Sequence, residues 1–172
     1  MRLKDKTAII TGGGSGIGLA TARAFCKEGA KVILFGRRKE KLISAADELG
    51  DSVLIVQGDM THNDDLDQLI NKTLNNFKGI DILVNSAGLF NGAPLHEISD
   101  SQWDGIMDIN IRSIFQLTRR VLPIMMAQKS GSIVHISSIL GLIAVPQVAA
   151  YNVSKGALNQ FSRSIAVEYG SY

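Results

Sequence analysis

The chain has 172 residues, of which 45% are hydrophobic and 20% charged, and its formal net charge is +2. These values fit a single soluble globular domain that spans residues 1–172. The small net charge and the lack of any dense Lys/Arg run argue against a nucleic acid partner. No apolar run approaches the ~20 residues of a membrane helix, and the N-terminus lacks a signal-peptide pattern, so we expect no membrane association.

Cysteine and histidine are sparse in this sequence. Cys26 is the only cysteine, which excludes an internal disulfide and fits a cytoplasmic location. The histidines at 62, 96 and 135 are scattered and form no ligand-like cluster, so we expect no metal site.

Strand-like apolar segments alternate with helical patterns along the chain. We expect strands at residues 7–11, 31–35, 52–57, 81–85 and 132–137, and helices at about 15–28, 39–49, 61–79, 101–128 and 149–169. Two of these helices begin with the spacing of a capping box, Thr61 with Asp64 and Ser99 with Gln102. The helix over 101–128 contains Pro123, near which it could bend. The alternation predicts an α/β fold with a Rossmann-type, doubly wound parallel sheet, in which ligands bind beyond the carboxyl ends of the strands.

A glycine-rich turn follows the first expected strand. Glycine lets the backbone approach a ligand closely, and the free N–H groups at the start of the next helix attract a pyrophosphate. We therefore expect this turn to bind a dinucleotide; a plain tight turn is the alternative. The candidate binding residues are Gly12, Gly14, Ser15, Gly16, Ile17 and Gly18. The pattern T-G-x-x-x-G-x-G is not a P-loop, and it resembles the short-chain dehydrogenase/reductase family.

The residues after the second expected strand indicate which nicotinamide cofactor is bound. An acidic residue at this place would bind the ribose 2′-hydroxyl of NAD, whereas this chain has Gly36-Arg37-Arg38. A guanidinium can grip a 2′-phosphate, so Arg37 and Arg38 favour NADP, with NAD still possible. The alternative is that both arginines are solvated residues at the start of a charged helix. Family members can also carry a basic residue at the position of Ser15, which this chain lacks.

Two short segments after later strands extend the resemblance. Asp59 and Met60 follow the third strand, and the resemblance implies that they lie against the adenine. Asn85-Ser86-Ala87-Gly88 is similar to the family's N-N-A-G, with Ser86 in place of the second Asn. The resemblance implies that Ala87 and Gly88 let the backbone run past the cofactor. Asn85 ties neighbouring strands together or contacts the cofactor.

The strongest chemical signal is the set Ser138, Tyr151 and Lys155. Tyr151 and Lys155 are four residues apart and share one face of the last expected helix, and Ser138 ends the fifth expected strand. A tyrosine hydroxyl can donate the proton that ketone reduction requires, and a nearby ammonium stabilises the tyrosinate. Lys155 could also hold the nicotinamide ribose, while Ser138 would donate a hydrogen bond to the substrate oxygen. The resemblance adds Asn110 as a fourth catalytic residue, holding a water that links the lysine to solvent.

Together these signals predict an oxidoreductase that transfers hydride between NADP(H) and a secondary alcohol or its ketone, a small-molecule substrate. The resemblance covers Leu3 to about Glu168 and implies a homo-oligomer formed through the helices that carry Asn110 and Tyr151. Family members continue with further strands and a substrate-covering loop, so we expect a C-terminally truncated fold with an unpaired strand edge. The alternative function is a non-catalytic nucleotide-binding or regulatory protein.

Overall fold

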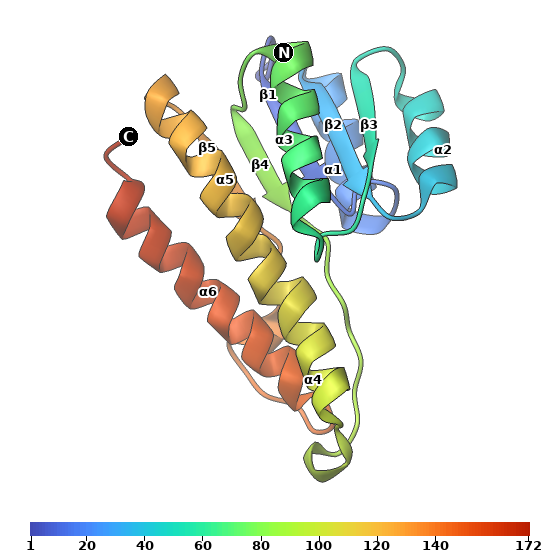
Figure 1. Ribbon diagram of the computed structural model, residues 1–172, viewed down its shortest axis with the longest axis vertical. Coiled ribbons are helices and arrows are strands. Elements are labelled where there is room, and N and C mark those ends of the chain that lie inside the picture. The colour runs from blue at the N-terminus through green and yellow to red at the C-terminus, as the bar shows by residue number, and fades with distance from the viewer.

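The computed structural model describes all residues from Met1 to Tyr172. The chain forms five parallel strands joined by helices (Figure 1). The strands are β1 (Thr7–Thr11), β2 (Lys31–Gly36), β3 (Val53–Gln57), β4 (Ile82–Asn85) and β5 (Ser132–His135). The α-helices are α1 (Gly16–Lys27), α2 (Lys39–Leu49), α3 (Asn63–Phe77), α4 (Asp100–Met107), α5 (Ser113–Gln128) and α6 (Ala149–Tyr169). A π-helical turn (Asp108–Arg112) joins α4 to α5, and two short 3-10 turns cover Leu95–Glu97 and Ile139–Gly141.

The sheet has the strand order β3-β2-β1-β4-β5, and every pairing is parallel. This is the Rossmann-type, doubly wound α/β fold that the sequence predicts. The strand order reverses between β1 and β4, so the connections that leave these two strands diverge and open a crevice at their carboxyl ends. β3 and β5 are the edge strands.

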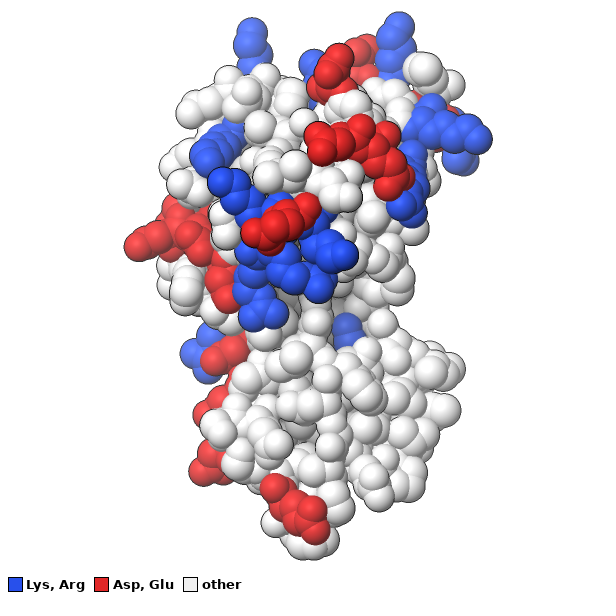
Figure 2. All heavy atoms as spheres, turned by 90° about the vertical axis from the view of Figure 1, so that its right-hand side faces the viewer, with Lys and Arg blue, Asp and Glu red and all other residues white.

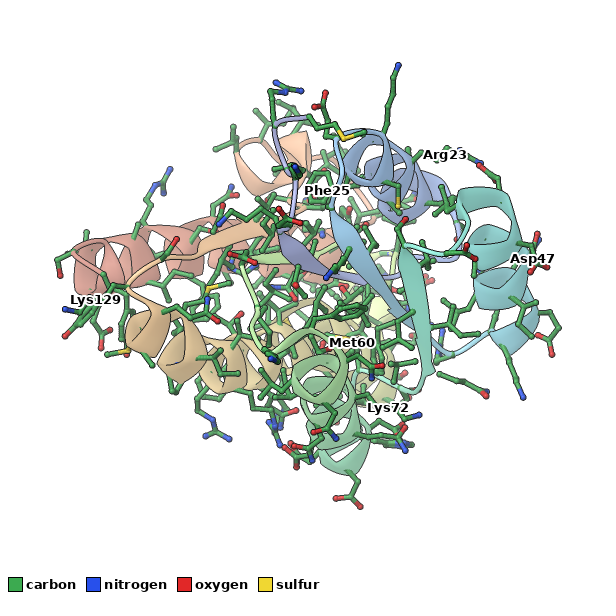
Figure 3. All side chains as sticks on the ribbon, turned by 90° about the horizontal axis from the view of Figure 1, so that it is seen from above. Arg23, Phe25, Asp47, Met60, Lys72 and Lys129 are labelled. Carbon is green, nitrogen blue, oxygen red and sulfur yellow. The ribbon has the colours of Figure 1, made fainter.

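Both faces of the sheet are buried, which explains why the central strands carry consecutive apolar residues, such as Ala8–Ile10 in β1 and Ile82–Val84 in β4, rather than alternate ones. Side chains that point to one face, such as Ile9 and Leu83, pack with α3 and α5. Their neighbours in the sequence, such as Ala8 and Val84, pack with α1 and α2 on the other face. Seen from above, α1 and α3 lie on opposite sides of the sheet (Figure 3). No helix is both long and apolar enough to cross a membrane.

Two expected helix starts have different outcomes. The capping box at Ser99 is confirmed: Ser99 Oγ accepts the Gln102 N–H at 3.3 Å, and Gln102 Oε1 accepts the Ser99 N–H at 2.9 Å. The capping box at Thr61 is wrong, because α3 begins at Asn63 after His62. Thr61 instead donates its backbone N–H and its hydroxyl to Asp59 Oδ1 at 2.9 and 2.8 Å, so its side chain serves the turn before the helix.

Two other boundaries differ from the expected ones. The helix expected over 101–128 is interrupted at Asp108–Arg112 by the π-helical turn, whereas Pro123 lies inside the continuous α5. The fifth strand ends at His135 rather than at Ser137. Ser138 therefore does not end a strand; it caps the 3-10 turn Ile139–Gly141, and its Oγ accepts the Leu140 N–H at 3.1 Å. Both differences lie beside the candidate site.

Candidate dinucleotide and catalytic site

A cleft of about 450 Å³ lies at the carboxyl ends of β1, β2 and β4. Most of the residues expected to bind a cofactor line it: Gly12, Gly14, Ser15, Gly16, Ile17, Arg37, Arg38, Asp59, Met60, Ala87 and Gly88. Gly18, Asn85, Tyr151 and Lys155 are not part of this lining. Gly36 and Ser86, which belong to the sequence motifs but were not expected to bind the cofactor, also line the cleft. So do five residues that the sequence did not indicate: Lys41, Leu42, Gly58, Leu89 and Ile109.

The glycine turn forms a cradle that larger residues would fill. Gly12 and Gly16 have φ values of 65° and 54°, in the left-handed region that favours glycine. A Cβ at Gly18 would lie 2.5 Å from the carbonyl oxygen of Gly12, so only glycine lets α1 start this close to the turn. Ser15 precedes α1 without a side-chain capping bond, which leaves the first N–H groups of the helix available to an anion. The turn thus fits a pyrophosphate.

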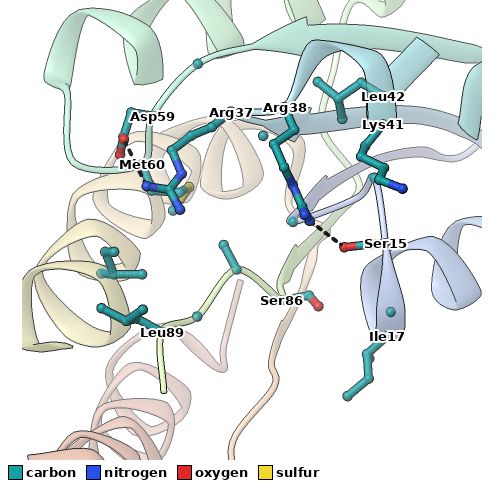
Figure 4. Close-up of a pocket in the computed structure, with 18 residues that line it drawn as sticks. Ser15, Ile17, Arg37, Arg38, Lys41, Leu42, Asp59, Met60, Ser86 and Leu89 are labelled. Atoms are coloured by element: carbon teal, nitrogen blue, oxygen red, sulfur yellow. Dashed lines mark hydrogen bonds and ion pairs between the residues drawn. The ribbon is translucent and has the colours of Figure 1, made fainter. Parts of the chain in front are cut away.

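Three basic side chains, Arg37, Arg38 and Lys41, stand on one wall of the cleft (Figure 4). Arg38 Nη2 donates to Ser15 Oγ at 3.1 Å, which brings a guanidinium directly to the glycine turn. Arg37 Nη1 lies 3.8 Å from Asp59 Oδ2. Figure 2 shows the basic side chains gathered above a hollow in this face. Since Lys41 lies in the first turn of α2, three residues after Arg38, the sequence could have indicated it through helical spacing.

Asp59 is ionised more readily than a free aspartate. Burial would raise the pKa of its carboxyl, but the hydrogen bonds from Thr61 and the charges of Arg37 and His62 outweigh burial, so the pKa lies below its ordinary value. The carboxylate therefore holds Arg37 at the mouth of the cleft and leaves Arg38 without an acidic partner.

Asn85 connects elements behind the cleft. Its side chain is buried, and its Nδ2 lies 3.0 Å from His135 Nδ1 and 3.5 Å from Thr118 Oγ1. It therefore links β4 to β5 and α5, in agreement with the strand-tying role considered for it. Burial lowers the pKa of His135 to about 4, which keeps this ring neutral.

Thr11 fastens the end of β1 to the segment that follows β4. Its Oγ1 accepts the backbone N–H groups of Ser86 and Ala87, both at 3.0 Å. The floor of the cleft is thus fixed by a hydroxyl in the first residue of the glycine turn.

Lys155 lies beneath the cleft, next to Tyr151. Lys155 is 5% exposed, and its Nζ donates to the carbonyl oxygen of Ile136 at 2.8 Å. The same nitrogen lies 5.5 Å from the centre of the Tyr151 ring. It forms no ion pair with a carboxylate. Burial lowers the pKa of the ammonium. A Cβ added to Gly88 would lie 3.8 Å from Lys155 Nζ, so the absence of a side chain at Gly88 keeps the cleft lining close to the ammonium.

The 3-10 turn that Ser138 caps packs against α6, and it thereby places Ser138 beside this helix. Ser137 Oγ donates to the carbonyl oxygen of Lys155 at 3.3 Å, and Asn159 Nδ2 donates to the carbonyl oxygen of Gly141 at 3.2 Å. Both bonds hold the turn against the helix that carries Tyr151. Because Ser138 Oγ accepts from Leu140, its own hydrogen remains available to a substrate oxygen.

Asn110 lies in the π-helical turn and is fully buried. Its Oδ1 accepts the Leu89 N–H at 2.8 Å, and its Nδ2 donates to the Leu89 carbonyl oxygen at 2.9 Å and to Ser154 Oγ at 3.0 Å. The side chain therefore joins three segments: the helix interruption, the loop after β4 and the helix that carries Lys155. The expected water between Asn110 and Lys155 stays a prediction.

The fold is a Rossmann-type α/β fold, and its candidate site lies at the carboxyl ends of the parallel strands. The family model of the short chain dehydrogenases matches residues 6–172, and the chain belongs to that family. An uncharacterised oxidoreductase of Staphylococcus aureus is 38% identical over 167 residues, which cover 96% of this chain and 72% of the relative. Nodulation protein G of a Rhizobium species is 37% identical over 166 residues, 96% of this chain and 68% of that protein. A crystal structure of a short chain dehydrogenase from Bacillus anthracis superimposes with a TM-score of 0.94 at 31% identity, covering 98% of this chain and 71% of that one.

Proposed function

We propose that this oxidoreductase transfers hydride between NADP(H) and a secondary alcohol or its ketone, with Tyr151 as the acid and base. The observation that carries the proposal is the buried ammonium of Lys155, which has a carbonyl partner but no carboxylate and lies 5.5 Å from the Tyr151 ring centre. A positive charge that no carboxylate neutralises stabilises an adjacent tyrosinate, and it does so more strongly in a buried setting than in water.

The side chains divide the chemistry between them. When bound, the nicotinamide dinucleotide supplies or accepts the hydride. The Tyr151 hydroxyl donates a proton to the substrate oxygen during reduction and removes it during oxidation. Ser138 donates a hydrogen bond to the same oxygen, where negative charge develops. Asn110 acts indirectly as a positioning residue, because its bonds to Leu89 and Ser154 fix the cleft lining relative to Lys155.

The cradle residues would hold the dinucleotide. The glycine turn and the first N–H groups of α1 suit the pyrophosphate, and the basic wall suits a 2′-phosphate. No carboxylate ends β2, and Arg38 already reaches the glycine turn through Ser15. These features support NADP over NAD.

Turnover by the tyrosine variant tests the reaction. Oxidation of NADPH by a panel of ketones is followed for the wild type, for Tyr151→Phe and for Tyr169→Phe, a control at the far end of the same helix. We expect Tyr151→Phe to lose at least about 100-fold in kcat while NADPH affinity changes little, because a general acid contributes about that much. Turnover equal to the control would refute the role of Tyr151. NADPH binding without turnover on any carbonyl would instead favour a non-catalytic nucleotide-binding protein.

Cofactor choice is tested separately by binding. The Kd values of NADPH and NADH are measured by fluorescence titration for Arg38→Ala, Arg37→Ala and Arg119→Ala, the last of which packs on Phe115 away from the cleft. Loss of a charge-assisted bond worth about 1.5–3 kcal/mol should weaken NADPH about 10- to 100-fold in Arg38→Ala and leave NADH nearly unchanged. We expect a smaller loss for Arg37→Ala, whose guanidinium is shared with Asp59. Equal losses for both nucleotides would refute the assignment.

A further inference from the structure

The segments that flank the proposed catalytic groups carry no charge. Residues 82–95, which comprise β4 and the segment that follows it past the cleft, contain no Asp, Glu, Lys or Arg. Residues 130–154, which include Ser138 and Tyr151, contain none either. The two segments touch: a Cβ on Gly92 would lie 2.5 Å from the Gln147 carbonyl oxygen and 2.8 Å from Val148 Cγ1. They therefore form one continuous uncharged wall.

Large apolar side chains stand on this wall and face outward. Phe90 is 61% exposed, and its ring meets the Tyr151 ring edge-on at a centroid distance of 4.9 Å. Ile139 and Leu142 are 63% and 70% exposed, and they line the same groove as Ser138. Since Phe90 contacts Tyr151, exposed apolar side chains lie next to both proposed catalytic groups. The apolar surface begins at the two residues proposed to handle the substrate oxygen.

The charged side chains of the molecule lie outside these two segments. In the view of Figure 2, basic and acidic side chains cover much of the upper part of the molecule, and the lower part has acidic side chains at its left edge and bottom with uncharged residues between them. Lys155 is buried beneath the wall and bonded to Ile136. One charged side chain, Arg163, borders the groove on which Ser138, Ile139 and Leu142 also lie, and its Nη1 is 3.4 Å from Gln160 Oε1. Arg163 is thus the competing explanation for recognition of an anionic substrate.

We propose that the substrate is a neutral ketone, or the matching secondary alcohol, with hydrocarbon or aromatic substituents, rather than an oxo acid or a phosphorylated sugar. This inference rests on the proposed function. A carboxylate placed against an apolar wall loses its hydration without gaining a cation, which is costly, whereas an apolar substituent gains from the same burial.

The reaction balances for such a substrate. In reduction, the carbonyl carbon accepts a hydride, with its two electrons, from the reduced dinucleotide, and the carbonyl oxygen takes the proton of the Tyr151 hydroxyl. The ketone would become an alcohol, and the two electrons that it gains would come from the dinucleotide. Tyr151 regains its proton from solvent. No charged substituent takes part in any of these transfers.

A matched pair of ketones tests the proposal at neutral pH. Methyl 3-(4-acetylphenyl)propanoate and 3-(4-acetylphenyl)propanoate share a skeleton, and only the second carries a charge. Two methylene groups separate the ester or carboxylate from the ring, so the ketones have similar intrinsic reactivity. We expect the neutral ester to have a kcat/KM at least about 10-fold higher, which corresponds to about 1.4 kcal/mol. Leu142→Lys should lower the ester-to-carboxylate ratio of kcat/KM, because the new ammonium would attract the carboxylate. Val167→Lys, at an 88% exposed position near the end of α6, should leave this ratio unchanged. Equal values for the two ketones would overturn the proposal. A carboxylate preference that disappears in Arg163→Gln would also overturn it and assign recognition to Arg163.

A binding measurement separates this proposal from the proposed function. Saturation-transfer NMR on the NADPH-loaded protein reports contact with each ketone even where no turnover occurs. Absence of turnover with either ketone counts against the proposed function. In that case, stronger magnetisation transfer to the ester than to the carboxylate still supports a neutral substrate. Stronger transfer to the carboxylate, or transfer to neither compound, overturns the proposal of a neutral substrate.

Discussion

Replacing Asn110 by Ala removes three hydrogen bonds from a fully buried position. Two of them satisfy the backbone N–H and carbonyl oxygen of Leu89, and the third reaches Ser154 Oγ. A typical intramolecular hydrogen bond contributes about 1 kcal/mol net, so we expect Asn110→Ala to lower the free energy of unfolding by about 3 kcal/mol. For a chain of this size the melting temperature should fall by about 6–12 °C.

Urea unfolding followed by circular dichroism measures this loss directly. The control is Asn76→Ala, since Asn76 is exposed on α3 and makes one side-chain bond, from Nδ2 to the Lys72 carbonyl oxygen. We expect that variant to stay within about 0.5 kcal/mol of the wild type. If Asn110→Ala were no more destabilising than Asn76→Ala, the three bonds would not hold the helix interruption to the cleft lining, and the reasoning would fail.

Two further predictions concern pH and the glycine turn. The folded pKa of His135 is about 4 against 6.5 for the free ring, so as pH falls through this window the unfolded chain binds a proton that the folded chain does not. Stability should therefore decrease by about 3 kcal/mol as the pH falls, and His135→Gln should remove most of that dependence in urea titrations across the window. Gly18→Ala should weaken NADPH binding at least about 10-fold, because the new Cβ would meet the Gly12 carbonyl oxygen at 2.5 Å. The control is Gly105→Ala, whose Cβ would meet only Leu89 Cδ2 at 4.0 Å, and it should bind NADPH with the wild-type affinity. Equal NADPH affinities in the two variants would contradict the proposal that the glycine turn binds the dinucleotide.

The strands and the glycine turn could be predicted from the sequence because their causes are local. Apolar runs buried on both faces define β1, β2 and β4, and the glycines identify the tight approach of α1 to the turn. The bounds of α6 were also predictable, because its helical pattern runs without interruption from Ala149 to Tyr169.

The errors arose where residues compete for the same partner. Thr61 has the spacing of a helix cap, but Asp59 lies two residues earlier and takes its hydroxyl and N–H. The π-helical turn was not predicted, and the bonds of its Asn110 reach Leu89 and Ser154, which are distant in the chain. The basic wall was identified only in part, because Lys41 joins the arginines through the fold of α2.

The π-helical turn also determines which changes in chain length this region can accept. It closes wider hydrogen-bonded rings than an α-helix does, so one more residue is accommodated between α4 and α5 than an unbroken helix would hold. Each α-helical residue advances the phase by about 100°, given 3.6 residues per turn. Losing one residue here would rotate everything downstream by that angle and swing the buried side of α5 toward solvent. A change in the number of residues here would therefore displace all of α5, whereas a substitution at a position other than Asn110 acts only locally.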